Sequence, residues 1–227
     1  MMETDSLLSN LQTLRTRISI ACERAGRNPD TVELLPVTKG HPAEKIRALY
    51  DLGFRRFGEN YVQEMEKKAH QLGTLAGIQW VFLGRVQSNK INNLVMVCDE
   101  IQALEQLSHA ARLAKATQKP IQIYIAVNCG LELHKSGVPL AQVESFAREL
   151  QLYPQLDLQG LFAVPPEIVD SQLRHQLYTQ LATLACTIGK GRLSLGMSQD
   201  VEAAVEAGST LVRVGTALLG PHEGKTP

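Results

Sequence analysis

The sequence lacks the features by which a membrane protein, a metal protein or a nucleic-acid-binding protein is usually recognised. No apolar run approaches the roughly 18 residues of a bilayer-crossing segment, and the four cysteines lie far apart with no CxxC pair. Lysine and arginine (23) balance aspartate and glutamate (23), so the formal net charge is zero. We therefore expect no membrane span and no metal or redox site, and the charge does not favour nucleic acid or an anionic membrane as partner.

The first residues also lack the basic character of a secretory signal. The opening stretch, MMETDSLLSN, is acidic, so we expect a cytoplasmic protein. Thiols stay reduced in that compartment. We expect the cysteines to be reduced and mostly buried, with Cys129 alone at a strand end that could expose it.

What the sequence does contain is an alternation of short β-rich runs and longer segments of helical period. This alternation is typical of βα units around a parallel sheet. Eight strands are predicted, over residues 32–37, 55–58, 78–84, 95–101, 121–128, 158–164, 193–198 and 210–215. Helices are predicted over residues 5–24, 43–52, 61–72, 103–117, 140–152, 171–188 and 199–207.

This organisation favours one closed (β/α)8 barrel of the TIM type over an open doubly wound sheet, because no linker rich in Pro, Gly or Ser divides the chain. We predict a single α/β domain over residues 1–227, with an N-terminal helix and lead-in over 1–31 and a short tail over 218–227. The tail is too short for a full closing helix. We therefore expect the N-terminal helix to cover part of the barrel's outside.

The ends of the last two predicted strands are rich in small and hydroxyl-bearing residues. In such barrels the reactive residues stand at the carboxyl ends of the strands, and phosphate commonly binds beside the last two. Here these ends contain Ser198, Gly215 and Thr216. Their hydroxyls and backbone amides favour a phosphate site, and the alternative is that they serve only as turn and cap residues.

Arg213 is the charged residue of the last predicted strand, TLVRVG. Alternation places it on the face opposite Val212 and Val214. The valines suit the layer between strand and helix, so the arginine points into the barrel. A buried guanidinium needs a partner, and the candidates are a phosphate, an aromatic ring nitrogen or a carboxylate such as Glu59.

Lys39 ends the apolar run LLPVTKG, with no carboxylate beside it. In a closed barrel the first strand lies next to the eighth, so this lysine and the phosphate edge are neighbours across the mouth. A partly desolvated lysine can attack a carbonyl to form a Schiff base. Lysine, phosphate site and arginine are the parts that pyridoxal phosphate requires, although a cofactor-free Schiff-base aldolase acting on a phosphorylated sugar uses the same parts.

Several motifs, in their order along the chain, resemble the pyridoxal phosphate homeostasis protein family of the YggS/PROSC type. They are LPVTKG, FGENYVQE, IQWVFLGRVQSNK, HKSG and LSLGMSQDVEAAVEAGSTLVRVGTALLG, and they span about residues 32 to 220. The resemblance implies a barrel like the N-terminal domain of alanine racemase. It also implies that the protein binds pyridoxal 5'-phosphate (PLP) and takes part in PLP homeostasis and amino-acid balance.

The family's functional residues can be placed on the matching positions of this chain. The resemblance implies that Lys39 holds PLP as a Schiff base and that Asn60 lies beside the ring. It implies further that Arg213 faces the ring nitrogen and that Met197 lines the pocket. The phosphate ligands implied are Ser198, Gly215 and Thr216.

Three positions depart from the family pattern. The family commonly reads V-S-K-T where this chain reads VTKG, so Gly40 lacks a hydroxyl and loosens the loop. Val81 stands where a histidine usually follows the tryptophan, which removes any polar role there. His134 is also not the usual residue, and we expect it to face solvent, whereas Lys135 stands where the family often has a lysine at the mouth.

Arg213 and the lack of a second base bear on catalysis. An arginine at the ring nitrogen disfavours its protonation, which weakens the ring as an electron sink and argues against transamination. Racemisation would need an acid or base on the face opposite Lys39. The local candidates fit better as a helix-start aromatic or as solvated loop charges; they are Tyr61, Lys90, His134 and Lys135.

The sequence therefore predicts a PLP-binding regulator or carrier rather than an enzyme. Two alternatives remain, a weak PLP-dependent amino-acid racemase and the cofactor-free aldolase. We expect a monomer, with PLP-dependent apoenzymes as candidate recipients of the cofactor.

Overall fold

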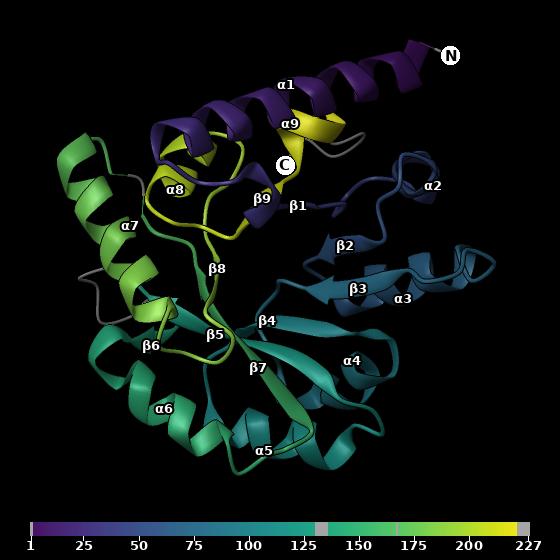
Figure 1. Cartoon of the computed structure of the whole chain (residues 1–227). Coiled ribbons are helices and arrows are strands. Elements are labelled where there is room, and N and C mark those ends of the chain that lie inside the picture. The colour runs from purple at the N-terminus through teal and green to yellow at the C-terminus, as the bar shows by residue number, and fades with distance from the viewer. Residues whose placement is uncertain (1, 130–135, 167, 222–227) are drawn as a thin grey trace.

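The structure, a computed structural model, describes residues 2–129, 136–166 and 168–221 (Figure 1). Its strands are β1 (Glu33–Pro36), β2 (Arg56–Glu59), β3 (Gln79–Phe82), β4 (Glu100–Leu104), β5 (Ile121–Asn128), β6 (Val138–Pro139), β7 (Leu156–Ala163), β8 (Arg192–Ser194) and β9 (Leu211–Val214). Its α-helices are α1 (Met2–Arg24), α2 (Ala43–Asp51), α3 (Val62–Gln71), α4 (Ile91–Val97), α5 (Leu107–Ala116), α6 (Val143–Leu150), α7 (Ser171–Ala185), α8 (Val201–Glu206) and α9 (Thr216–Leu219).

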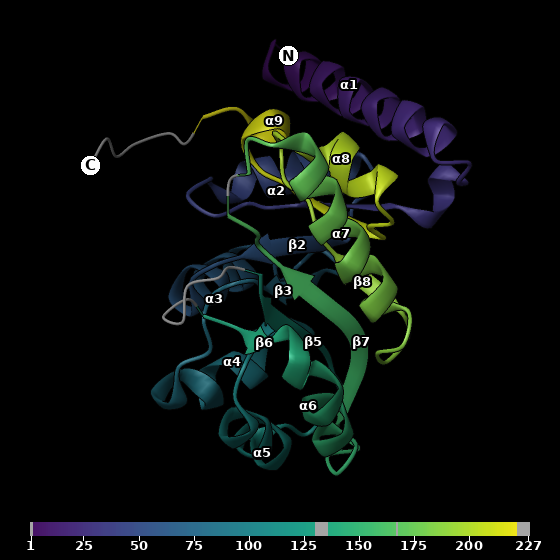
Figure 2. The same ribbon diagram turned by 90° about the vertical axis from the view of Figure 1, so that its left-hand side faces the viewer.

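The described strands pair in parallel, in the order β1-β9-β8-β7-β5-β4-β3-β2, and the short β6 adds to β5. An isolated bridge between Val37 and Gly58 links the end of β1 to β2. Eight parallel strands thus form a nearly closed barrel with helices around it (Figure 2). The predicted TIM-type barrel is confirmed, including the pairing of the first strand with the last.

Alternation along the strands separates two cores. Val212 and Val214 face outward into the large cluster that the helices also join. Leu35, Val81 and Leu211 face inward and pack together inside the barrel. Each such fully buried aliphatic side chain stabilises the fold by about 1.5–3 kcal/mol, so both faces of the sheet hold the barrel.

The N-terminal helix covers part of the barrel's outside, as expected. α1 packs against α8 and α9, and both views show it lying across them (Figures 1 and 2). The Arg17 guanidinium makes two bonds to the Glu202 carboxylate, at 2.6 and 2.7 Å. The buried face of the helix has the i, i+3, i+4 spacing of an amphipathic helix and consists of Leu7, Leu11, Leu14 and Ile18.

The prediction for the fourth strand is wrong. Residues 95–97 end α4, in which Ile91, Leu94 and Val95 are buried. β4 begins only at Glu100 and takes in residues 103–104, which we expected to start a helix; the helix α5 begins at Leu107. A short apolar run cannot be assigned to a buried helix or a buried strand by periodicity alone.

Smaller differences concern strand ends and exposure. β8 ends at Ser194 rather than residue 198, so the residues that follow form a loop. The four cysteines are free; Cys22 and Cys98 are buried and Cys129 is half-buried, but Cys186 is exposed, contrary to expectation. No helix within the described ranges is both long and apolar enough to cross a membrane.

Candidate functional site

Lys39 lies in the turn after β1, at the carboxyl ends of the strands, and its side chain is half-buried. The turn is held on both sides, because the Val37 amide donates to the Val214 carbonyl and the Thr38 amide donates to the Gly58 carbonyl, each at 2.9 Å. Within the described part of the chain the Lys39 ammonium has no hydrogen bond or ion pair. Its amine therefore stands at the barrel mouth without a protein partner.

The three residues expected to bind phosphate lie together at this edge. Ser198 Oγ accepts a hydrogen bond from the Ala217 amide at 3.4 Å, which joins the loop after β8 to the first turn of α9. Gly215 precedes that turn, and a Cβ added to it would lie 3.4 Å from the Val37 carbonyl oxygen. The hydroxyls and amides of Ser198, Gly215 and Thr216 thus border the strand that carries Lys39.

The loop between β8 and α8 is fixed by hydrogen bonds from its flanks. The Met197 amide donates to Asp200 Oδ1 at 2.6 Å, and the Tyr178 hydroxyl donates to Asp200 Oδ2 at 2.5 Å. The Arg17 guanidinium contacts the Ser198 carbonyl at 3.1 Å. The Met197 side chain itself is 44% exposed.

Arg213 is buried inside the barrel, as alternation predicts. Its guanidinium donates to Ser194 Oγ at 2.6 Å and to the Ala163 carbonyl at 2.8 Å, and it lies 4.5 Å from the centroid of the Phe162 ring. Burial lowers its pKa to about 10, opposed by the charges of Asp200 and Tyr178. The group remains charged at neutral pH, although no carboxylate contacts it directly among the described residues.

The countercharge of Arg213 is reached through two neutral side chains. Ser194 Oγ donates to Gln102 Oε1 at 2.7 Å, and Gln102 Nε2 donates to Glu100 Oε1 at 2.6 Å. In each of these hydrogen bonds the donor lies on the Arg213 side and the acceptor on the Glu100 side. Hydrogen bonds aligned in this way polarise one another. We call the whole set the core network: Glu33, Arg56, Glu100, Gln102, Arg192, Ser194 and Arg213.

The alternative in which Glu59 pairs with Arg213 is wrong. Glu59 ends β2 facing outward, and its side chain is fully buried. One carboxylate oxygen accepts bonds from Thr38 Oγ1 at 2.5 Å and from Lys68 Nζ at 2.7 Å. Burial raises the pKa of Glu59 above its ordinary value, against the effect of the lysine.

A cavity of about 300 Å³ opens at the mouth beside Arg213. Its inner wall includes Phe162, the ring that the Arg213 guanidinium covers. Its rim includes Arg85 and Glu105, which form an ion pair at 2.9 Å. The volume lies at the lower end of the range for small-ligand pockets. Among the described residues Arg213 and Lys39 do not line this cavity; Phe162 separates it from the arginine.

Asn60 lies half-buried at the same end of the barrel, directly after β2. The β3 loop comes so close that a Cβ on Gly84 would lie 2.1 Å from the Asn60 carbonyl oxygen. Only glycine allows this approach. Val81, one of the departures from the family pattern, packs in the barrel interior and so fills its position with an apolar contact.

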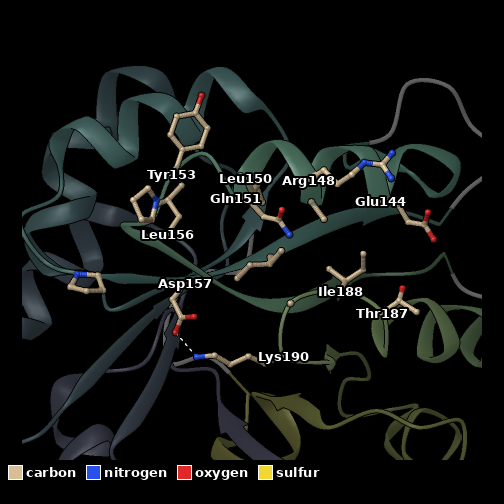
Figure 3. Close-up of a pocket in the computed structure, with 15 residues that line it drawn as sticks. Glu144, Arg148, Leu150, Gln151, Tyr153, Leu156, Asp157, Thr187, Ile188 and Lys190 are labelled. Carbon is tan, nitrogen blue, oxygen red and sulfur yellow. Dashed lines mark hydrogen bonds and ion pairs between the residues drawn. The ribbon is translucent and has the colours of Figure 1, made fainter.

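A larger groove, of about 830 Å³, lies at the opposite end of the barrel, between α6 and the turn before β8. Figure 3 shows the residues that line it, including the ion pair of Asp157 with Lys190 at 2.6 Å. Reactive residues of such barrels stand at the other end. We therefore place the candidate site at the mouth.

Sequence reasoning missed the residues that hold Arg213 and the loop after β8. Ser194 alternates with outward leucines and could have been found from the strand period, but Gln102 fell between the predicted strand over 95–101 and the predicted helix over 103–117. Tyr178 carries no signal, since it is one aromatic residue in a long helix. His134 and Lys135 lie outside the described residues, while Tyr61 is 64% exposed at the start of α3.

Comparisons with known proteins agree with this geometry. Residues 9–223 match the family of the alanine racemase N-terminal domain. The Pyridoxal phosphate homeostasis protein of Escherichia coli K12 is 38% identical over 231 residues, covering 96% of this chain and 98% of its own. The protein of the same name from Pseudomonas aeruginosa is 35% identical over 227 residues, covering 98% of both chains.

Solved structures give the same result. PipY of Synechococcus elongatus, solved with PLP bound, superposes with a TM-score of 0.78 at 31% identity, covering 91% of this chain and all of its own. Alanine racemase of Corynebacterium glutamicum superposes with a TM-score of 0.66 at 17% identity, covering 92% of this chain and 60% of its own. At that identity the second likeness concerns the fold alone.

Proposed function

Because the chain belongs to the alanine racemase N-terminal domain family, and within it to the pyridoxal phosphate homeostasis proteins, we propose that it binds PLP and takes part in PLP homeostasis. PipY, which resembles it in sequence and fold, has been solved with PLP bound. PLP supplies a carbonyl that condenses with amines and a ring that withdraws electrons from the product. The residues at the barrel mouth fit these groups.

The observation that carries the proposal concerns two cations at one mouth. Among the described residues no carboxylate contacts the buried Arg213 directly, and Lys39 has no hydrogen bond or ion pair. In the proposed site Lys39 holds the cofactor covalently as a Schiff base. Arg213 donates to the ring nitrogen, and Asn60 lies beside the ring. Met197 lines the pocket, and the phosphate is bound by Ser198, Gly215 and Thr216.

The same arginine favours a regulator or carrier over an efficient enzyme. A permanently charged donor keeps the ring nitrogen unprotonated, so the ring stabilises negative charge weakly. Tyr61, one candidate for a second acid or base, is largely exposed at the rim. Holding and handing over the cofactor requires only the lysine, the arginine and the phosphate residues.

The visible absorption spectrum tests the proposal. The wild-type protein mixed with PLP should turn yellow, the band should shift on borohydride reduction, and the reduced label should map to Lys39. The Lys39→Ala variant should show no such band. A colourless wild-type protein that takes up no PLP would contradict the proposal and favour the cofactor-free aldolase.

A weak amino-acid racemase is the second candidate, because the fold is also that of alanine racemase. This activity predicts exchange of the α-hydrogen of an amino acid with solvent deuterium, lost in Lys39→Ala. The measurement is NMR of L-alanine and other amino acids incubated with PLP-loaded protein. Absence of exchange with every amino acid removes this candidate.

The rest of the proposal concerns compartment and partners. We propose a single-domain cytoplasmic monomer that passes PLP to apoenzymes. Light scattering of the purified protein tests the monomer. Restoration of activity to a PLP-dependent apoenzyme by the loaded protein, faster than by the equivalent free PLP, tests the transfer.

A further inference from the structure

A second cluster of charge lies behind Lys39, on the outside of the barrel. We call it the clamp: Glu59, Glu64 and Lys68. The Lys68 side chain is only 5% exposed, and its ammonium contacts the Thr38 carbonyl at 2.7 Å, Glu59 Oε1 at 2.7 Å and Glu64 Oε1 at 2.6 Å. An ammonium has three N–H donors, so every donor of Lys68 Nζ has an acceptor.

The clamp contacts the chain immediately before and after Lys39. On one side, the Thr38 carbonyl accepts from Lys68 and the Thr38 hydroxyl donates to Glu59 at 2.5 Å. On the other side, the Gly40 amide donates to Glu64 Oε1 at 2.6 Å. Bonds to charged groups are about twice as strong as neutral ones, so the turn that presents Lys39 is fixed at both ends.

Gly40 explains why the second contact matters. Its φ is +70°, in the left-handed region that glycine adopts without strain. A glycine in a turn also has the greatest freedom to leave that conformation. The bond from its amide to Glu64 opposes this freedom, so the loop that Gly40 loosens is held by a side chain from α3.

Stability alone does not account for this arrangement. Buried ion pairs often contribute little net stability, because desolvation offsets their attraction. Glu64 could satisfy Lys68 from the helix as an i, i+4 pair without reaching the turn. Its same oxygen nevertheless accepts from Gly40, 24 residues away in the chain.

We propose that Glu64 and Lys68 are positioning residues that hold the Lys39 turn in place and thereby set how slowly the protein releases its cofactor. This inference rests on the proposed function, since it concerns the same lysine. Release of a cofactor held as a Schiff base consumes one water, which hydrolyses the bond between Lys39 Nζ and the PLP carbon and leaves the free amine and the PLP aldehyde. Opening of the turn would carry Lys39 away from the phosphate edge and let water reach that bond. The clamp lowers the population of that open turn.

The test compares Glu64→Ala and Glu64→Gln with a control on the same helix. Glu66→Ala is the control, because Glu66 lies two residues along α3 and bonds the exposed Asn93 rather than the turn. Each protein is loaded with PLP and mixed with excess apoenzyme as a trap, while the loss of the visible band is followed. Hydrogen exchange of the Gly40 amide is measured on the unloaded proteins.

Glu64→Ala should release PLP about tenfold faster than wild type, the change expected when one charge-assisted bond is lost. Glu64→Gln keeps a neutral acceptor and should be intermediate, while Glu66→Ala should match wild type. Exchange at Gly40 should follow the same order. Should Glu64→Ala fail to fold, the comparison of Glu64→Gln with Glu66→Ala decides the question.

Equal release rates in wild type and the Glu64 variants would overturn the inference, even if exchange at Gly40 rises. A wild-type protein that takes up no PLP contradicts the proposed function instead. In that case the exchange measurement decides the clamp alone, and an unchanged Gly40 rate in the Glu64 variants contradicts it.

Discussion

The core network and the clamp bury charge on opposite faces of the same barrel wall. In the core network two glutamates and two arginines pair at the amino ends of the strands, through Arg56 with Glu33 and Glu100 and through Arg192 with Glu33. Two neutral side chains then connect this group to Arg213. In the clamp two carboxylates surround one ammonium.

The two clusters differ in what their outermost contacts hold. The core network ends on a cationic side chain that lies over Phe162, a residue of the cavity wall. The outermost contacts of the clamp are with two peptide groups, the Thr38 carbonyl and the Gly40 amide, so the clamp holds the backbone of the turn. Burial raises the pKa of both Glu59 and Glu100, and the charges of Lys68 and Arg56 oppose that effect. Both clusters therefore carry a desolvation cost that ion pairing partly offsets.

The largest loss of stability is expected from Arg56→Met, a change in the core network. The change leaves Glu100, whose side chain is 1% exposed, without its ion pair. Removing one partner of a buried pair costs about 3–5 kcal/mol, measured as the loss in free energy of unfolding in urea. Arg55→Met is the matched control, since the exposed Arg55 lies over the Tyr50 ring and should cost about 1 kcal/mol or less; equal losses would contradict the importance of the core network.

A smaller effect is expected from Gln102→Leu, which separates Arg213 from Glu100 while keeping the barrel packed. Ser194 loses its acceptor and Glu100 a donor, so stability should fall by about 1–3 kcal/mol. PLP affinity, measured by titration of the visible band, should fall roughly tenfold, because Arg213 is then held less firmly. Gln159→Leu is the control, because within the described ranges the side chain of this buried glutamine bonds only Asp157; an equal loss of affinity in that variant would contradict the role given to Gln102.

The smallest effect is expected in the pH dependence of the stability that Glu59 of the clamp contributes. The folded Glu59 carboxyl has a pKa raised above 4.5, so it binds its proton more tightly than in the unfolded chain. Its contribution to stability is therefore present below that value and is lost as pH rises through the raised pKa. Urea unfolding between pH 4.5 and 8 should show wild-type stability falling relative to Glu59→Gln, and a constant difference would refute the assignment.

The features of the site that depend on a single strand, or on closure of the barrel, could be predicted from the sequence. Alternation in TLVRVG placed Arg213 inside the barrel, and the pairing of the first strand with the last placed Lys39 near Gly215 and Thr216. The first inference needs only the two-residue period of a strand, and the second needs only closure of the barrel. The extent of the single domain and the roles of the site residues stay predictions.

The contacts between strands that face each other across the barrel interior could not be predicted from the sequence. Ser194 on β8 meets Gln102 on β4, and these strands are not neighbours in the sheet. No local pattern specifies that contact, and the error in the bounds of the fourth strand left Gln102 outside it, between the predicted strand and the predicted helix. The wrong partner for Arg213 has a different origin, because Glu59 shares the outward face of β2 with Phe57 and so points away from the barrel interior.

The contact of Arg17 with the Ser198 carbonyl joins positions 181 residues apart. Ribosomes add about 5–20 residues each second, so α1 waits on the order of 10–40 s before its partner loop is synthesised. The pairing of β1 with β9 is delayed equally. A nascent chain therefore lacks the phosphate edge until its last strand has emerged, and we expect that growing polypeptides do not draw PLP from the cell's supply.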